Sequence, residues 1–409
     1  MRVKDVLSLE PEIQKILQLG LARDLVIDGH CPGLSGTELN TFIEAGIGSY
    51  HSRLDSESFE EMTRLGISVQ VQETWLTPDL VRTIGRKNSS IPNFMFVTDD
   101  VSPGYIYEHG HLDHLLRRAI EYGMDPIEAI RRVTVFPAQW LRLHSLGAIG
   151  LGKLADLVIF EDLETLNVET VITNGRVVVR EGELVVLIKM ASSALAPLRS
   201  SVKADIPKEY AFRIQAPIWE GKIPVRVIEI IRETTETKLC IEELPVVEGS
   251  ISLEGYSDLN MILVFHRHGK AKKHGKGLLK GLGLAHGAVA STLAHDSHNL
   301  LVIGREPHDM RLAAVPLRDT GGGIIVVRDE RILATLCLPI AGIMSDQSVE
   351  DVVRAFSHLE NMVRRLGVYH RKPVQLITFL SLAVSPDIAL TDMGLVDVNN
   401  QTFLDLFPG

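Results

Sequence analysis

Three residues with metal-binding side chains stand out in the first hundred positions of the sequence. His30, His51 and Asp99 each follow a short apolar run of β-forming residues. The carboxyl ends of parallel strands in a βα sheet lie along one edge, so we expect the three side chains to meet there. Two neutral imidazoles and one carboxylate suit a divalent first-row metal ion.

Such a site would perform hydrolysis. A bound divalent metal brings the pKa of its water to about 7 and so supplies hydroxide at neutral pH. Asp99 would then be the catalytic residue that takes the water's proton and passes it to a leaving group. A second interpretation stays open on spacing alone. A histidine after a strand is commonly a hydrogen-bonded loop residue, and 98–100 (Thr-Asp-Asp) is also suited to capping the next helix.

The elements that must position these residues alternate between strand and helix over 1–145. Between the strands lie predicted helices, and after the last strand an apolar helical face ends at Gly123, followed by a helix opened by Asp125. This rhythm predicts a parallel α/β sheet. The predicted strands are 24–28, 46–50, 67–72 and 93–98, and the first two helices are 36–45 and 56–65.

From Gly147 onward the sequence pattern is that of short strands and turns instead of alternating strands and helices. Asn174-Gly175 between two β-like runs is a strong hairpin signal. Residues 190–210 show no clear period and are typical of a linker. The later chain mixes strands with amphipathic helices. We therefore predict three domains, at 1–145, 146–205 and 206–409. The strands expected in the third are 223–231, 261–265, 300–304, 323–328 and 332–338, with helices at 305–320 and 348–366.

Composition narrows the class of protein. The net charge of −10 over 409 residues argues against nucleic acid or an anionic membrane as partner. No run approaches the roughly 18 apolar residues of a membrane span, and the charged N-terminus has no apolar signal core. The cysteines are far apart in sequence, which favours reduced thiols over disulfides (Cys31, Cys240 and Cys337). We expect a cytoplasmic protein.

Several motifs together resemble the bacterial and archaeal adenine deaminases of the amidohydrolase superfamily. The third domain carries the most specific of them, because few other amidohydrolases have such a domain. The motifs are 28–36 (DGHCPGLSG), 94–100 (FMFVTDD), 110–115 (GHLDHL), 125–130 (DPIEAI), 147–160, 280–284 (KGLGL), 294–299 (AHDSHN), 321–323 (GGG) and 338–346 (LPIAGIMSD).

The resemblance implies hydrolysis of adenine to hypoxanthine and ammonia, a reaction of adenine catabolism and purine salvage, with Mn²⁺ or Fe²⁺ as cofactor. His30 and His51 match the metal ligands that follow barrel strands five and six. Asp99 matches the strand-eight aspartate that binds metal and shuttles protons. A small composite β-domain and a family-specific α/β C-terminal domain are expected after the barrel.

The resemblance also implies an incomplete barrel. Met1 corresponds to a point just past strand four, so the strand-one His-x-His pair and the strand-four carboxylate are expected to be absent. Strands five to eight alone cannot close a (β/α)8 barrel, and they leave edges that invite pairing. We therefore expect a homo-oligomer or a partner chain that supplies the missing half-barrel.

The motifs around the site also depart from the family. The chain has Tyr50-His51-Ser52 where the family has Asp-His-Glu, and 71–74 (VQET) where it has Ile-Arg-Glu-Gly. We expect little or no deaminase activity from this polypeptide alone. Three explanations are open. The chain is half of a split enzyme, a fragment from a late start assignment or gene decay, or a catalytically silent paralogue that acts as a binding or assembly subunit. The departures at Tyr50, Ser52 and Gln72 favour divergence over an error in the start assignment, which would leave the remaining motifs intact.

Other features have a structural and a functional interpretation each. Residues 294–299 hold His295 and His298, and a substrate loop and a hydrogen-bonded turn are equally compatible with them. The basic stretch 267–280 is more typical of a solvated, mobile loop than of a phosphate-binding loop. Residues 321–323 (GGG) most simply indicate a turn into a strand, with close backbone approach to a ligand as the alternative. His111 indicates a helix start packed against the next domain, with a role at the substrate edge as the alternative.

Overall fold

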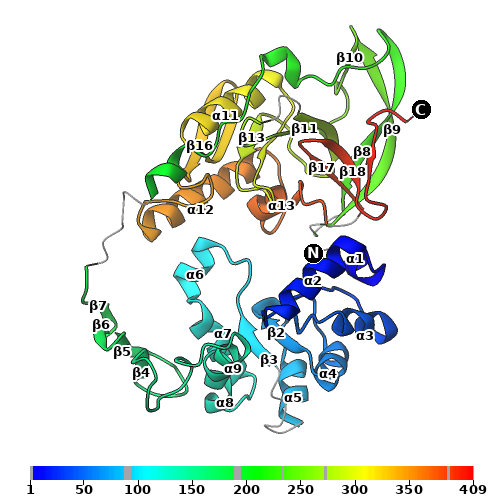
Figure 1. Ribbon diagram of the computed structural model, residues 1–409. Helices are drawn as coiled ribbons and strands as arrows, with labels where there is room; N and C mark the ends of the chain where they lie inside the picture. The colour runs from blue at the N-terminus through cyan, green and yellow to red at the C-terminus, as the bar shows by residue number, and fades with distance from the viewer. Residues whose placement is uncertain are drawn as a thin grey trace. The chain divides into compact units, whose positions relative to one another are not determined.

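The computed structural model describes residues 3–86, 94–187, 195–231, 234, 236–270, 274–384 and 387–408. The chain divides into two compact units, Met1–Lys189 and Met190–Gly409 (Figure 1). Each unit has a hydrophobic core of its own. No helix in the described residues is long and apolar enough to cross a membrane.

The first unit is built on a parallel sheet of three strands in the order β1-β2-β3. Alternate residues of β2 and β3 are buried in the core shared with the helices, among them Val69, Val71, Phe94 and Phe96 at 0–3% exposure. The strands are β1 (Ser49–Tyr50), β2 (Ser68–Gln72) and β3 (Phe94–Val97). The helices are α1 (Val3–Leu7), α2 (Pro11–Ala22), α3 (Gly36–Glu44), α4 (Ser56–Arg64), the 3₁₀ helix η1 (Glu73–Trp75), α5 (Pro78–Arg86), α6 (Pro103–His109), α7 (Leu112–Glu121), α8 (Pro126–Arg131) and α9 (Val135–Trp140).

The strand expected at 24–28 does not form. Residues 25–31 are not assigned to any strand, although the Ile27 carbonyl accepts a hydrogen bond from the Gly48 amide (3.1 Å). The Gly29 amide instead donates to the Asp28 side chain (3.0 Å). A side chain that accepts a hydrogen bond from a nearby backbone amide competes with the hydrogen bonds between strands. The last expected strand is confirmed as β3, and Asn93 lies outside the described residues.

The helix signals in the sequence are largely confirmed. Asp125 caps α8 by accepting the Glu128 amide (3.0 Å). α7 ends at Glu121, and Gly123 follows with a φ of +99°, a conformation that favours glycine.

A small antiparallel sheet closes the first unit, in the order β4-β5-β6-β7. The hairpin predicted at Asn174-Gly175 joins β5 to β6, and both residues have positive φ (49° and 75°) as a tight turn requires. The strands are β4 (Leu157–Phe160), β5 (Val168–Thr173), β6 (Arg176–Arg180) and β7 (Glu183–Leu184). Residues 188–194, which include the start of the predicted linker, lie outside the described residues.

The second unit is built on a nine-stranded sheet in the order β10-β9-β8-β12-β11-β14-β13-β15-β16. Side chains of β11 alternate between two cores: Ile262 and Val264 pack with α12 and α13, whereas Leu263 and Phe265 pack with α11. The strands are β8 (Gly221–Ile230), β9 (Thr237–Val247), β10 (Ser250–Ile251), β11 (Leu259–Phe265), β12 (His274–Lys280), β13 (Ala288–Ser291), β14 (Leu300–Gly304), β15 (Gly323–Arg328) and β16 (Arg331–Cys337). Around them lie η3 (Ala196–Ser200), η4 (Glu209–Phe212), α11 (Pro307–Asp319), α12 (Val349–Arg365), α13 (Pro373–Phe379) and a three-stranded sheet of β17 (Ile388–Thr391), β18 (Gly394–Asp397) and β19 (Thr402–Leu404).

The prediction of a solvated, mobile loop over 267–280 is wrong for its second half. Residues 274–280 form β12, which lies between β8 and β11 inside the sheet. Leu278 and Leu279 are fully buried there. Pairing with β11 along seven residue pairs satisfies the backbone, and tertiary packing therefore overrides a composition rich in lysine and glycine.

Candidate active site

His30 and His51 lie side by side next to β1, an edge strand of the parallel sheet. Their ring centroids are 4.9 Å apart, and His30 Nδ1 lies 2.6 Å from the His51 carbonyl oxygen. His30 follows residues 25–29, where the predicted strand does not form, and His51 follows β1 as predicted. The pair supplies two imidazoles of the kind that bind first-row metals.

Asp28 forms a polar cluster behind this pair. Its Oδ1 accepts hydrogen bonds from the Ser49 hydroxyl and from Gln70 Nε2 (2.9 Å). Its Oδ2 lies 3.8 Å from His51 Nδ1, a buried nitrogen that has no hydrogen-bond partner among the described residues. A carboxylate in this place is suited to orienting an imidazole. Sequence reasoning missed Asp28 and Gln70, although Asp28 stands only two positions before His30.

Asp99 is held by a different partner. Its Oδ2 accepts a hydrogen bond from Gln72 Nε2 (3.0 Å), at the carboxyl end of β2. Asp99 itself has a φ of +56°, which aspartate tolerates better than most residues. In the stretches of chain that the structure describes, no three side chains of His, Cys, Asp or Glu gather closely enough to hold a metal ion. The structure thus joins His30 to His51 but does not bring Asp99 into one ligand group with them.

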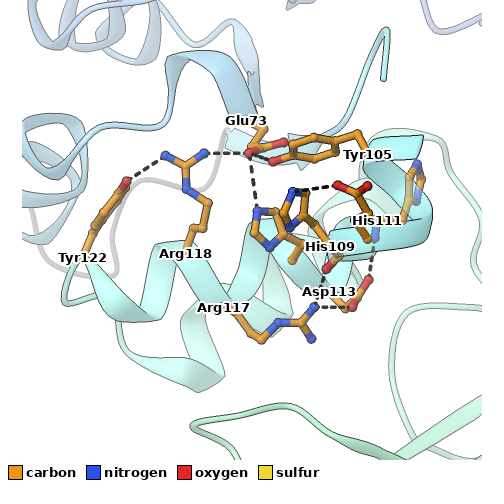
Figure 2. A network of polar contacts seen from close by, with 10 residues as sticks. Glu73, Tyr105, His109, His111, Asp113, Arg117, Arg118 and Tyr122 are labelled. Atoms are coloured by element: carbon orange, nitrogen blue, oxygen red, sulfur yellow. Dashed lines mark hydrogen bonds and ion pairs between the residues drawn. The ribbon is translucent and has the colours of Figure 1, made fainter. Parts of the chain in front are cut away.

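Glu73 is the centre of a second cluster, at the end of β2 (Figure 2). Its Oε1 accepts hydrogen bonds from the Tyr105 hydroxyl and from Arg118 Nη1 (2.6 Å), and His114 Nε2 lies 3.6 Å away. Burial alone would raise the pKa of Glu73, but the donors from Tyr105 and Arg118 outweigh it and lower that pKa. Burial together with Glu73 raises the pKa of Tyr105 to about 12.

His111 anchors the start of α7 beside the strand end. Its Nε2 lies 2.8 Å from the Thr98 hydroxyl, and its backbone amide donates to Asp113 Oδ1 (2.7 Å). Asp113 also pairs with Arg117 at 2.6 Å (Figure 2). The prediction that His111 stands at a helix start is confirmed.

His295 and His298 of the second unit take part in packing and in a turn. His295 stacks on Phe379, with ring centroids 4.7 Å apart and planes 4° from parallel. The Ala294 amide lies 3.2 Å from His298 Nδ1. The turn predicted at 321–323 leads into β15, and a Cβ at Gly323 would lie 2.0 Å from the Leu336 carbonyl oxygen, so the approach of the two backbones excludes a side chain.

Comparison with known proteins agrees with this division of the chain. The amidohydrolase family model matches residues 7–178, and the adenine deaminase C-terminal domain model matches residues 234–402. A protein named adenine deaminase from Moorella thermoacetica is 36% identical over 421 residues, which cover 100% of this chain and 70% of that protein. One from Thermosipho melanesiensis is 34% identical over 412 residues, with the same coverage of 100% and 70%.

The fold and the matched segments define a mixed α/β protein with an amidohydrolase-type first unit. The chain belongs to the adenine deaminase family. Among solved structures, a β-aspartyl dipeptidase from Fervidobacterium islandicum AW-1 is 16% identical with a TM-score of 0.34, over 43% of this chain and 55% of that one. A zinc complex of the atrazine chlorohydrolase from Arthrobacter aurescens TC1 is 17% identical with a TM-score of 0.32, over 44% and 49%.

Proposed function

We propose that this chain carries some of the residues of an adenine deaminase-type active site, which hydrolyses adenine to hypoxanthine and ammonia once further ligands complete it. The supporting observation is the close pair of His30 and His51, with Asp99 after β3 of the same parallel sheet. The relatives that share the whole length of the chain are named adenine deaminases. In this proposal 1–145 is half of a (β/α)8 barrel, 146–205 a small β-domain and 206–409 the family's C-terminal domain.

The proposed cofactor is Mn²⁺ or Fe²⁺, and the described residues fit it only partially. Two imidazoles are suitable donors. No third ligand completes the group: Asp99 is engaged by Gln72, and no three His, Cys, Asp or Glu side chains of the described residues, Asp28 beside His51 included, are placed to hold a metal ion. We therefore assign no catalytic step to a metal in this chain alone, and propose that its own deaminase activity is weak or absent.

Metal analysis and an ammonia assay test this proposal. The purified chain, given Mn²⁺ or Fe²⁺ and adenine, is expected to bind less than one equivalent of metal and to release no detectable ammonia. His51→Ala is expected to reduce the residual metal further, whereas His358→Ala, on α12, serves as the control and leaves it unchanged. Ammonia release by the unmodified chain alone would show that its site is complete.

The missing ligands are proposed to come from βα units of a partner polypeptide. β1 and β3 are edge strands of the sheet, and α2 with the segment 25–28 lines an apolar groove of about 400 Å³. Ile16, Leu19 and Leu25 are 55%, 46% and 57% exposed beside it. Exposed apolar side chains next to a strand edge are typical of a surface that another chain covers.

Complementation tests the partner. The part of the Moorella thermoacetica relative that lies outside its match to this chain is expected to bind this chain and to restore ammonia release from adenine. Leu19→Glu together with Leu25→Glu should abolish the association. Tyr369→Glu, at a side chain in the second unit that is 90% exposed, is the matched control and should have no effect. Self-association without the added segment would identify a second copy as the partner instead.

The alternative is a catalytically silent paralogue that acts as a binding or assembly subunit. Tyr50, at the position of the family's aspartate, is 1% exposed, and its hydroxyl donates to the Arg53 carbonyl oxygen. This position therefore belongs to the core. A chain that binds the added segment but still holds no iron, manganese or zinc would favour the silent role.

A further inference from the structure

Two successive side chains at the end of β2 point to different partners. Gln72 donates to Asp99. Glu73 binds Tyr105 on α6 and Arg118 on α7 (Figure 2). The end of one central strand is thus connected both to the candidate catalytic aspartate and to the two helices that follow it in the chain.

The Glu73 carboxylate is largely withdrawn from water. Its side chain is 13% exposed and that of Arg118 is 29% exposed. A carboxylate withdrawn from water is costly unless it is paired and hydrogen-bonded, and removal of one partner exposes that cost. Arg118 is fixed in turn by a hydrogen bond to the Tyr122 hydroxyl (2.7 Å). The pair is therefore held from both sides.

The segment from Thr98 to His111, which contains α6, is restrained because its two ends are in contact. The Thr98 hydroxyl contacts His111 Nε2 at 2.8 Å, which closes the loop where it leaves β3 and where it enters α7. Tyr105 lies midway along this stretch, in α6, and its hydroxyl reaches Glu73. Asp99 is the second residue of this segment and lies in the loop between β3 and α6.

We propose that Glu73 is a positioning residue: through Tyr105 and Arg118 it holds α6 and α7 at the carboxyl end of β2, and thereby fixes the loop that carries Asp99. The role of Asp99 rests on the proposed function, whereas the restraint on α6 and α7 is measured without any activity. Failure of the deaminase assay and failure of this proposal are therefore separate results.

His114 reports the charge on Glu73. Its ring faces Glu73 on one side and His109 on α6, with Arg117 and Arg118 nearby on its own helix. Burial lowers the pKa of His114, and the Glu73 carboxylate acts against that shift. Loss of the carboxylate charge must therefore lower the pKa of His114 further, a change that simple loss of packing does not produce.

Glu73→Gln in the full chain tests the proposal, with Glu108→Gln as the matched control. Glu108 is also a glutamate of this region, but it is 69% exposed and lies 3.9 Å from His109. In Glu73→Gln, amide hydrogen exchange is expected to rise about tenfold in α6, α7 and the loop between β3 and α6, because a charge-assisted contact to each helix is lost. The pKa of His114, followed by NMR of labelled histidines, is expected to fall. Glu108→Gln should change neither quantity.

Tyr105→Phe keeps the test decisive if Glu73→Gln does not fold. It removes one donor to Glu73 and leaves Arg118 in place, so faster exchange is expected in α6 with a smaller change in α7. Unchanged exchange in α6 and α7 in both variants overturns the proposal. So does an acceleration spread equally over α3, α4 and α5, since that pattern indicates general loss of stability.

Discussion

Asp55 shows how one side chain sets both the start of a helix and a dependence on pH. It is the N-cap of α4, where its Oδ1 accepts the Ser58 amide (2.9 Å) and the Ser58 hydroxyl accepts the Asp55 amide (3.1 Å) in return. The hydrogen bonds from Ser58 lower the pKa of Asp55. Because the folded protein favours the charged carboxylate, the cap is stronger when Asp55 is ionised.

Asp55→Ala is therefore expected to lower the free energy of unfolding by about 1 kcal/mol at neutral pH. A depressed folded pKa gives stability that is present above the unfolded pKa of about 3.9, and that is lost as pH falls through the folded pKa. The difference between the wild type and Asp55→Ala in urea unfolding should hence shrink below about pH 4. Asp55→Asn keeps an acceptor without a charge, so its difference from Asp55→Ala should not shrink. A wild-type difference that is constant down to pH 3 would rule out the ionised cap.

The candidate residues that sequence reasoning found are those that follow predicted strands. His30 and His51 could be paired in advance because parallel strands place their ends along one edge. Asp28, Gln70 and Glu73 could not, since each reaches partners that lie 21 to 45 residues away in sequence and that only the packed sheet and helices bring close. Their types alone are common on protein surfaces.

At the scale of single elements, β12 is distinguished by two glycines with different surroundings. A Cβ on Gly275 would lie 1.9 Å from the Thr391 carbonyl oxygen, whereas on Gly277 the nearest atom would be a methyl group of Ile262 at 3.5 Å. The first distance excludes any side chain unless the backbones separate, and the second is ordinary contact. β12 and β17 can therefore approach only because residue 275 has no side chain.

Gly275→Ala is expected to lower the free energy of unfolding by about 1–3 kcal/mol, as overpacking in a core commonly does. Gly277→Ala, on the same strand, is the matched control. It should stay within about 1 kcal/mol of the wild type, because the methyl group fits and the unfolded chain loses freedom. Urea unfolding measures both. Equal effects at the two positions would mean that the Thr391 backbone moves freely away from β12.

The elements that the sequence predicted well are those with a single dominant signal. α8 has its aspartate cap and following proline, and the β5–β6 hairpin has Asn-Gly. The failures at 24–28 and 274–280 run in opposite directions. In the first, an apolar run forms no strand, although the Ile27 carbonyl oxygen accepts a hydrogen bond from the Gly48 amide. In the second, a polar and glycine-rich run becomes a central strand because both neighbours supply partners.

At the scale of the whole chain, the two units differ in how completely each buries its sheet. The second unit covers both faces of its nine-stranded sheet, with α11 on one side and α12 and α13 on the other. The first unit has three parallel strands, of which β1 and β3 are edges, and several exposed leucines on and around α2. Open strand edges beside exposed apolar side chains form a surface that another chain can pair with or cover.

The second unit, residues 190–409, is therefore expected to fold when produced alone, with a cooperative urea transition and intact near-ultraviolet circular dichroism, because its two cores are internal to it. The first unit, residues 1–189, is expected to self-associate when produced alone, since its strand edges and exposed leucines remain available. Sedimentation of each unit over a tenfold range of concentration separates the two behaviours.

Leu19→Glu with Leu25→Glu in the isolated first unit should reduce the association. A monomeric first unit that unfolds at higher urea than the second would contradict the argument, and would mean that three parallel strands are sufficient for a stable unit.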